Sequence, residues 1–552
     1  MKNHSVMQHS FDRTPKVKMP RSVFNRSHGW KGLCDTDFLY PFYVDEVLPG
    51  DTFNLKATVL TRLFSSAIRP FMDNLWIDTA FFFVPNRLVW LNWAKFMGEQ
   101  NNPGDSISYN VPQCVGPNVA SSGIPIGHLF DYMGLPVGPL SGGGGTTGIA
   151  FNNLHGRAYN LIYNTWYRSQ DISNSVQIDV GDGPDTFSQY NLLRRQKRFD
   201  YFTQALPYLQ KSSTAVPLVL AGSAPVVTSV SAQVSGAQQP LIWVNSAGNS
   251  PAPHPMQVSS AGVTQTNTGA NGTVAETLYP QNLYADLTST AAGTINGLRQ
   301  AIATQQFLER DARGGTRYPE LISSHFGVEN PDARVQKPEI LGLSSSPLKI
   351  FPVAQTSATG LTGGTTSTGT LSGFGAGAAN GGFVKSFTEH GVLIGLLNFR
   401  ADITYQQGQD RMWNRRTRYD YFWPTYAHLG EQSILNREIY ANLPDGTGAA
   451  QKDGVFGYVP RHDEYRFKKS LICADLRSYN GNSVNASTVD LWHLSEAFSS
   501  QPVLNTTFME VRVPLDRCIS VPAQPHFIVD AFFDLKCARV MPVFGVPGLT
   551  RL

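Results

Sequence analysis

Two segments near opposite ends of the chain alternate between apolar and polar residues, which is the pattern of a β-strand with one buried face. In residues 52–63 one face carries Phe53, Leu55, Ala57, Val59 and Leu63. In residues 527–537 one face carries Phe527, Val529, Ala531, Phe533, Leu535 and Cys537. Strands so far apart in a chain share a sandwich only if long connections separate them, and long connections usually carry function.

Further strands are expected near residues 40, 80, 395, 460 and 510. Residues 80–84 are fully apolar, and residues 391–405 begin as an apolar run and then alternate. Helices are fewer, and apolar residues at helical spacing predict them over residues 156–168, 192–206 and 295–312. The expected fold is therefore mainly β: an antiparallel eight-stranded jelly-roll sandwich with long loop and helical insertions.

Uncharged segments indicate where insertions lie. Residues 212–295 contain no Lys or Arg and only two acidic residues, Glu276 and Asp286. Residues 350–384 contain no charged residue at all. We expect residues 32–552 to form a single domain, in which 212–295 is an insertion and 350–384 is an uncharged loop insertion.

The composition excludes several classes of protein. The N-terminus has no apolar segment of a secretory signal, and no run approaches the ~18 apolar residues of a membrane span, so no membrane insertion is expected. No C-x-x-C spacing occurs among the five cysteines, which are Cys34, Cys114, Cys473, Cys518 and Cys537. This favours buried free thiols in a cytoplasmic product over disulfides or a zinc site.

Signals for catalysis are weak. A G-x-G-x-x-G match within residues 143–148 has no strand before it and no helix-opening pattern after it. Asp530 and Asp534 share a strand face but would lie ~13 Å apart, too far for the carboxylate pair of a glycosidase. The acidic residues of 179–185 could gather around calcium, but the spacing is not that of a calcium loop, and an ordinary turn is favoured. We expect no enzyme, no cofactor and no metal site.

Basic residues are concentrated in two places. Residues 1–31 hold seven basic residues against one acidic residue, which predicts an N-terminal arm that suits a polyanion. The basic residues of this arm are Lys2, Arg13, Lys16, Lys18, Arg21, Arg26 and Lys31. The second cluster comprises Arg194, Arg195, Lys197 and Arg198. For the arm a solvated tail stays open as an alternative, and for the cluster a solvated helix face or a phosphate-facing patch.

Residues 410–424 concentrate Arg, Trp and Tyr. These residue types anchor protein interfaces because they bury a large area with few rotatable bonds. The candidate interface residues are Trp413, Arg415, Arg416, Arg418, Tyr419, Tyr421 and Trp423. Packing within the chain and stacking with single-stranded nucleic acid are the alternatives.

Blocks throughout the chain resemble the major capsid protein of gokushoviruses, small single-stranded-DNA bacteriophages of the microvirus family. The N-terminal blocks are RSVFNRSHGWKG (21–32), FYVDEVLPGDTFNL (42–55), MDNLWIDTAFFFVPNRLVW (72–90) and FMGEQNNPGD (96–105). Central and C-terminal blocks include ERDARGGTRYPELISSHFGV (309–328), SFTEHGVLIGLLNFRADITYQQG (386–408) and TRYDYFWPTYAHLGEQSILNREIY (417–440). The resemblance does not extend to the interior of 212–295 or of 350–384.

The resemblance implies a jelly-roll subunit that assembles in the bacterial cytoplasm into a T=1 icosahedral virion shell around circular single-stranded DNA. It also implies several partners: a small basic DNA-binding peptide, an internal scaffolding protein, a DNA pilot protein and a host surface receptor. In this family a large insert forms a protrusion at the three-fold axis, and residues 212–295 are the candidate. Its apolar residues include Leu218, Leu220, Leu241, Ile242 and Trp243. A carbohydrate-binding protein or glycosidase of jelly-roll type is the alternative.

Overall fold

The computed structural model describes residues 20–118, 123–138, 148–211, 295–328, 335–357, 368–478 and 489–543, together with six short strands between residues 226 and 285. The chain divides into two compact units. The first, which we name the sheet unit, comprises Met1–Leu209 and Thr316–Leu552. The second, which we name the inserted unit, comprises Gln210–Gly315.

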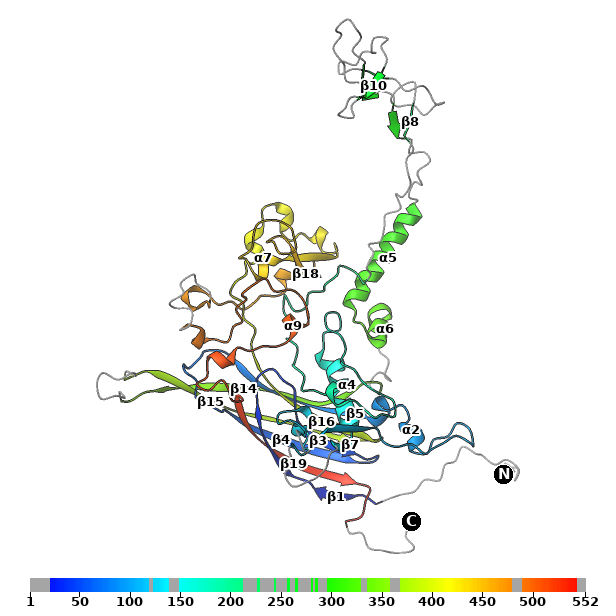
Figure 1. The fold of residues 1–552 in the computed structure, drawn as a ribbon, viewed down its shortest axis with the longest axis vertical. Helices are drawn as coiled ribbons and strands as arrows, with labels where there is room; N and C mark the ends of the chain where they lie inside the picture. Colours follow the sequence, from blue (N-terminus) through cyan, green and yellow to red (C-terminus); the bar gives the residue numbers. More distant parts are fainter. Residues whose placement is uncertain are drawn as a thin grey trace, which may run out of the picture. The chain divides into compact units, whose positions relative to one another are not determined.

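The sheet unit is built on one antiparallel sheet of nine strands (Figure 1). The strands are β1 (Ser22–Asn25), β2 (His28–Cys34), β3 (Tyr40–Val47), β4 (Thr52–Leu63), β5 (Leu75–Pro85), β14 (Glu339–Ala354), β15 (Leu371–Ser386), β16 (Gly391–Ala401) and β19 (Phe527–Arg539). Hydrogen-bonded neighbours follow the order β1-β19-β4-β15-β14-β5-β16-β3, and β2 also pairs with β19. The first and last strands of the sheet unit therefore lie side by side.

The two alternating segments of the sequence are neighbours in this sheet. Thr52 of β4 lies opposite Ala538 of β19, and Leu63 lies opposite Phe527. Along both strands the side chains alternate between buried and exposed or half-buried positions. The strands expected from period-two alternation are thus confirmed, since one face packs on the core and the other meets solvent.

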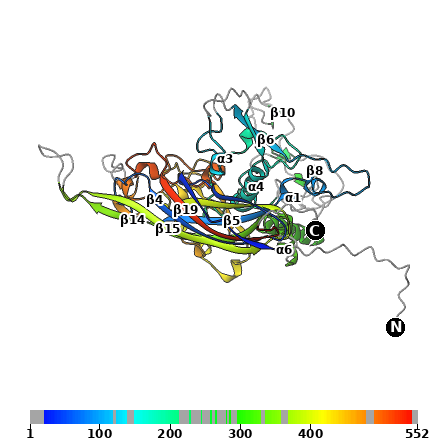
Figure 2. The same ribbon diagram turned by 90° about the horizontal axis from the view of Figure 1, so that it is seen from below.

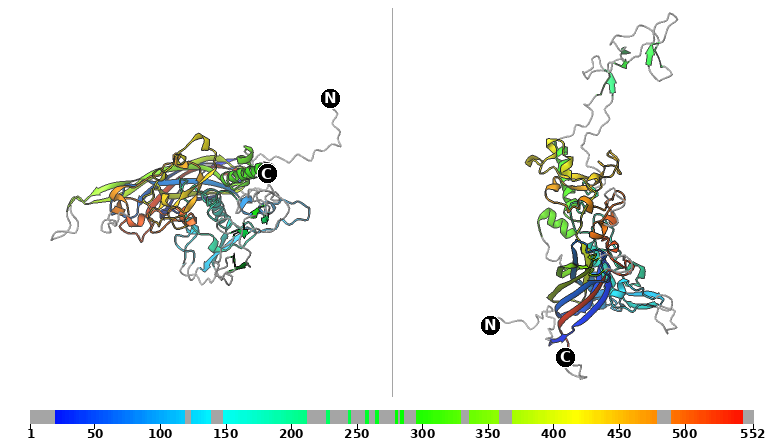
Figure 3. Two further views of the ribbon diagram at one scale, coloured as in Figure 1. Left: turned by 90° about the horizontal axis from the view of Figure 1, so that it is seen from above. Right: turned by 90° about the vertical axis from the view of Figure 1, so that its left-hand side faces the viewer.

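Aromatic side chains from distant parts of the strand order meet in one core. The ring of Phe533 on β19 lies 5.3 Å from that of Phe42 and 5.0 Å from that of Tyr43, both on β3. Phe399 of β16 stacks on Phe527 of β19 at 4.3 Å. The sheet must therefore curl until its two halves face each other, as Figure 3 shows. The fold is mainly β and is consistent with the expected sandwich.

The connection from β5 to β14 carries a second core on the opposite face of β5 and β16. Phe82 of β5 and Ile394 of β16 pack there with Trp90 and Tyr159, and Figure 2 shows α3 and α4 on this side of the sheet. Because both faces of β5 and β16 are covered, both strands are buried almost throughout. This explains why their sequences are continuous apolar runs rather than alternating ones. The elements of this layer are α1 (Asn86–Val89), α2 (Trp93–Phe96), β6 (Gln113–Asn118), α3 (Leu129–Tyr132), β7 (Gly148–Asn152), α4 (Leu154–Ile162), the π-helical turn η1 (Tyr163–Tyr167) and η2 (Phe187–Gln189).

The connection from β16 to β19 forms a third core around a two-stranded sheet, together with Tyr201, Phe202 and Ala205 of the earlier connection. Its elements are β17 (Glu431–Leu435), α7 (Asn436–Ile439), β18 (Val455–Pro460), α9 (Thr506–Met509) and the 3-10 turns η4 (Arg411–Asn414), η5 (Arg418–Asp420), η6 (Pro424–Tyr426), η7 (Asp463–Tyr465), η8 (Ala474–Leu476), η9 (Asp490–Trp492) and η10 (Leu515–Arg517). The strand expected near residue 460 is confirmed as β18, outside the main sheet. The strand expected near 510 is wrong, because only an isolated bridge from Glu510 to Gln196 forms there.

Two of the three expected helices are confirmed. Residues 156–168 fall on α4 and η1, and 295–312 on α5 (Ile295–Arg313). The helix expected over 192–206 is wrong, because this segment is extended and its backbone bonds reach other segments: Arg195 N–H donates to the carbonyl of Asp37 (2.7 Å) and Lys197 N–H to that of Met509 (2.7 Å). Helical side-chain spacing does not reveal such distant backbone partners.

Two further expectations are corrected. Residues 350–384 are not simply a loop, because β14 and β15 extend into this range and pair as a long hairpin. The sequence of this charge-free range predicts a loop, because its glycines and other small residues hide the alternation of apolar and polar side chains that marks a strand. Residues 20–31 are not a free arm either, because β1 and β2 occupy most of them. The rest of the predicted arm, residues 1–19, lies outside the described residues.

The inserted unit contains α5 and three antiparallel strand pairs. The strands are β8 (Val226–Thr228), β9 (Trp243–Val244), β10 (Met256–Val258), β11 (Thr264–Thr266), β12 (Tyr279–Pro280) and β13 (Leu283–Ala285). Trp243 lies on β9, whereas Leu218, Leu220, Leu241 and Ile242 fall outside the described residues. In the sheet unit, α6 (Tyr318–Phe326) follows α5 in the chain. Among the described residues, no helix combines the length and apolarity needed to cross a membrane.

Candidate functional site

An exposed aromatic surface lies on the connection from β16 to β19. Trp413 is 71% exposed, and the other members of the surface are between 45% and 53% exposed. They are Tyr419, Tyr421, Phe422, Trp423, Tyr465 and Phe467. The carboxylate of Asp420 fixes the turn that carries them by accepting the backbone N–H groups of Arg416 (2.8 Å) and Thr417 (2.7 Å). A surface with this many exposed aromatic rings is typical of a protein interface.

The structure divides the seven residues of the expected interface. Trp413, Arg416, Arg418, Tyr419, Tyr421 and Trp423 are exposed. Arg415 lies beneath them: its side chain is 9% exposed, it forms an ion pair with Glu464 at 3.2 Å, and its guanidinium lies 4.4 Å from the ring centre of Tyr465. Arg415 therefore packs within the chain, which was the alternative reading of this segment, while the other six remain available to a partner.

The basic cluster at 194–198 is largely engaged in ion pairs within the protein. Lys197 is buried and donates to Glu496 at 2.8 Å, and Arg194 lies 3.2 Å from the carboxylate of Asp37. Arg195 pairs with Asp78 at 2.5 Å and its side chain is 14% exposed. The expectation of a solvated helix face is therefore wrong. Lys197 and Arg195 are also unsuited to contact a genome, because a phosphate group binds only to N–H donors that it can reach.

Asp78 on β5 gathers three guanidinium groups around one carboxylate. Its Oδ2 lies 2.5 Å from Arg195, 2.7 Å from Arg400 and 3.3 Å from Arg198. Burial alone would raise the pKa of Asp78, but Arg195, Ser345 and Arg400 hold it below its ordinary value. Arg400 also pairs with Asp402 at 3.2 Å, so three cations face two carboxylates and an excess of one positive charge remains. Burial and the neighbouring Arg400 accordingly lower the pKa of Arg198.

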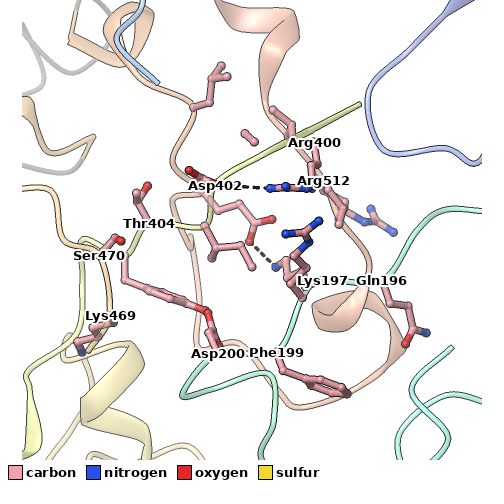
Figure 4. Close-up of a pocket in the computed structure, with 18 of the residues that line it drawn as sticks. Gln196, Lys197, Phe199, Asp200, Arg400, Asp402, Thr404, Lys469, Ser470 and Arg512 are labelled. Atoms are coloured by element: carbon pink, nitrogen blue, oxygen red, sulfur yellow. Dashed lines mark hydrogen bonds and ion pairs between the residues drawn. The ribbon is translucent and has the colours of Figure 1, made fainter. Parts of the chain in front are cut away.

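This excess charge borders a pocket of about 280 Å³, shown in Figure 4. Seven Lys or Arg side chains line it, against three acidic ones. Lys197 and Arg400 belong to its wall, while the exposed side chains of Arg198 (56%), Phe199 (75%) and Arg512 (54%) belong to its rim. Cations beside an accessible aromatic ring are suited to bind a phosphate together with an unpaired base.

The described residues of the basic N-terminus are only partly free. Arg26 forms an ion pair with Asp45 at 2.6 Å, and Arg21 donates to the hydroxyl of Thr52 at 2.6 Å. Lys31 is 79% exposed and lies 3.4 Å from Asp530. The four remaining candidates, Lys2, Arg13, Lys16 and Lys18, lie outside the described residues.

Comparison with known proteins identifies the family of this chain. The family model described as "Capsid protein (F protein)" matches residues 13–549. The chain belongs to this family of capsid proteins. It is similar to capsid protein VP1 of Bdellovibrio phage phiMH2K (41% identical, 98% of both chains), of Chlamydia phage 1 (39%, 99% of both) and of Spiroplasma virus 4 (32%, 99% of this chain and 98% of the relative).

In a capsid protein, exposed aromatic rings fit the contacts that subunits make with one another in a shell. Sequence reasoning missed several residues of these surfaces. They are Phe199 and Arg512 at the pocket rim, and Tyr465 and Phe467 on the aromatic surface. Signals were available for three of them, because Phe199 directly follows the basic cluster and Tyr465 and Phe467 stand next to the pair Lys468 and Lys469 in the sequence.

Proposed function

We propose that this chain is the major capsid protein of a gokushovirus and assembles into a T=1 icosahedral shell around circular single-stranded DNA. The observation that carries the proposal is the match to capsid proteins over almost the entire length of the chain. These relatives align with 98–99% of this chain, which supports a structural role along its whole length. The resemblance of the framework blocks supplies the narrower assignment to gokushoviruses. We propose no cofactor, metal ion or catalytic role.

The strand order supports an eight-stranded jelly roll. Without β1, the described strands of the main sheet fall into two runs of four, β2-β19-β4-β15 and β14-β5-β16-β3. When these eight strands are numbered one to eight in chain order, starting at β2, the first run holds strands one, eight, three and six. The second run holds strands five, four, seven and two. This is the arrangement of two Greek keys wrapped around one another, in which two sheets face each other. β1 then extends the edge already formed by β2.

The exposed aromatic surface supports self-association. Trp, Tyr and Arg are the residue types that contribute most to binding at protein interfaces, so their exposure together on one surface favours contact with a partner. We propose that Trp413, Arg416, Arg418, Tyr419, Tyr421 and Trp423 contact a neighbouring subunit. Closed symmetric assembly then buries every copy of the surface in the same way.

The basic pocket and the N-terminal residues support contact with the genome. We propose that Arg198, Phe199 and Arg512 at the pocket rim bind DNA, with Lys31, Arg21 and the arm at residues 1–19 as further contacts. The formal net charge of the chain is only +3, which neutralises little of a genome. A separate small basic DNA-binding peptide is therefore a physically reasonable partner.

Residues 212–295 are proposed as the three-fold protrusion that meets a host surface receptor. The internal scaffolding protein and the DNA pilot protein are proposed as partners from the resemblance alone, as is assembly in the bacterial cytoplasm.

The proposal is tested by producing the full-length chain together with the other virion proteins of its phage. Electron microscopy should show icosahedral particles of uniform size, and extraction should recover single-stranded DNA from them. A chain that stays monomeric under these conditions contradicts the proposed function. Particles of another symmetry contradict the T=1 shell but not the capsid role.

A further inference from the structure

A second pocket adjoins the basic pocket described above. Its volume is about 400 Å³, and residues of β5, β14, β16 and η1 line it. We name it the aromatic pocket, because Phe82, Trp166 and Tyr167 form part of its wall. Arg195 and Arg198 line both pockets, so the two pockets share a boundary.

The excess positive charge around Asp78 lies at this boundary, and one of its cations is accessible. The side chains of Arg195 and Arg400 are 14% and 9% exposed, whereas that of Arg198 is 56% exposed. A phosphate group that reaches the boundary from solvent therefore meets Arg198 first. A guanidinium group binds phosphate through charge-assisted hydrogen bonds, which are stronger than those between neutral groups.

An accessible aromatic ring lies on each side of this boundary. Phe199 is 75% exposed and belongs to the basic pocket, and Trp166 is 38% exposed and belongs to the aromatic pocket. The indole N–H of Trp166 donates to the carbonyl of Pro338 at 2.9 Å, and the ammonium group of Lys337 lies 4.9 Å from the ring centre. Because these contacts already hold the indole in place, a ligand that stacks on it orders little additional structure.

Two polar side chains of the aromatic pocket are already engaged within the protein. Asn398 accepts from Arg195 at 3.1 Å and donates to the carbonyl of Phe38 at 2.9 Å. The hydroxyl of Ser345 donates to Asp78 at 2.6 Å. The pocket therefore offers a base chiefly rings and apolar surface, which accept every base because each base has an aromatic face.

We propose that the two pockets bind consecutive nucleotides of single-stranded DNA, with the phosphate between them on Arg198 and one base each at Phe199 and Trp166. The proposal rests on the proposed genome contact of the pocket rim and adds the aromatic pocket as a second subsite, which accepts bases of any sequence. Charge complementarity favours this occupant over an apolar peptide, which would leave the positive charge at the boundary without a partner. A DNA duplex is disfavoured, because its bases stack on one another instead of on the protein.

The first test measures how soluble full-length subunits bind a fluorescent oligothymidine of about eight nucleotides, a length typical of single-strand sites. Trp166→Ala should weaken binding about 5-fold or more, which corresponds to the loss of one stacked base. The slope of log affinity against log salt should not change, because no phosphate contact is removed. Trp166→Phe keeps a ring and should retain affinity within about 2-fold of the unaltered chain, while circular dichroism checks the fold of each variant.

Two comparisons separate this subsite from a general effect. Trp413→Ala is the matched control, since Trp413 is an exposed tryptophan (71%) outside both pockets, and it should leave the affinity unchanged. An abasic strand of the same length keeps the phosphates, so Trp166→Ala should bind it as well as the unaltered chain does. Equal losses on both strands, or a loss from Arg198→Ala with none from Trp166→Ala, overturn the second subsite alone. An unaltered chain that binds no oligothymidine overturns the proposed genome contact as well.

A second measurement needs no substitution in the protein. An oligonucleotide that carries bromodeoxyuridine is bound to unaltered subunits and irradiated, so that its bases crosslink to the side chains beside them. Mass spectrometry should recover crosslinked peptides that contain Phe199 and others that contain Trp166. Recovery of the Phe199 peptide without the Trp166 peptide overturns the second subsite.

Discussion

Arg157 and Asp185 form a two-pronged ion pair with no exposed side-chain surface. Arg157 Nε donates to Asp185 Oδ2 at 2.8 Å, and Nη2 donates to Oδ1 at 2.5 Å. The carboxylate also accepts from the hydroxyl of Tyr190 at 2.9 Å. Burial alone would raise the pKa of Asp185, but these donors hold it below its ordinary value. The acidic turn at 179–185 is therefore tied to α4 by protein donors.

Removing the cation should destabilise the fold strongly. Arg157→Ala leaves the Asp185 carboxylate buried without its main partner, which costs about 3–5 kcal/mol in the free energy of unfolding. Urea denaturation of soluble subunits measures the loss. Lys31→Ala is the control, because that side chain is 79% exposed and its partner Asp530 52%, so its removal should cost less than ~1 kcal/mol. Equal stability of the two variants would contradict the prediction.

Stability should fall as pH rises from ~4 to about 7, because of Asp37, and should level off above that. Burial raises the pKa of this carboxyl to about 7, although the N–H of Val513 and the cation of Arg194 favour its charged form. In the unfolded chain the pKa is ~4, so between ~4 and about 7 the folded state binds more protons. The free energy of unfolding then falls with pH, by at most ~1.4 kcal/mol per unit. Denaturation midpoints at pH 5, 6, 7 and 8 measure it.

The matched variants for that series are Asp37→Asn and Asp534→Asn. Asp37→Asn should flatten the pH dependence, because an amide keeps the acceptor for Val513 but does not titrate. Asp534 lies at an exposed position of β19, so Asp534→Asn should leave the dependence in place. A slope that survives Asp37→Asn would show that another group is responsible.

Adjacent phenylalanines on β19 should respond in opposite ways. Phe533 is fully buried, and Phe533→Ala should cost about 3–5 kcal/mol because it leaves a cavity among aromatic rings. Phe532 is 55% exposed, and Phe532→Ala should cost less than ~1 kcal/mol. Thermal denaturation of subunits compares them. Similar losses would mean that the register of β19 is not the one described.

The pocket rim should contribute to DNA binding through charge. Arg198→Ala should weaken binding of a single-stranded oligonucleotide and reduce the slope of log affinity against log salt by about 0.7, the value for one phosphate contact on a single strand. Fluorescence anisotropy at several salt concentrations measures both. Lys385→Ala removes a half-buried cation away from the pocket, paired with Glu339 at 2.8 Å, and should change neither. An unchanged slope for Arg198→Ala removes this residue from the genome contacts.

Sequence patterns predicted the strands best where one face meets solvent, as in β4 and β19. In such strands apolar and polar residues alternate along the sequence. The patterns were weaker for β15, where glycines such as Gly373 and Gly375 pack closely against neighbouring residues rather than forming a turn. The sequence showed the basic cluster at residues 194–198, but it did not show that its side chains form ion pairs within the chain. The partners of Arg195 and Lys197, Asp78 and Glu496, lie far away in the chain, and no local pattern reveals them.

The sequence by itself determined the mainly β class, several strands of the framework, α5 and the membership of the family, because these depend on local periodicity and on residues that recur in relatives. Only the tertiary structure decided that β19 lies between β2 and β4, and that Arg415 is buried while Trp413 is exposed. The physical reason is that burial and ion pairing depend on segments brought together by folding. The tertiary structure therefore decides whether a charged side chain forms an ion pair within the chain or stays accessible to a partner.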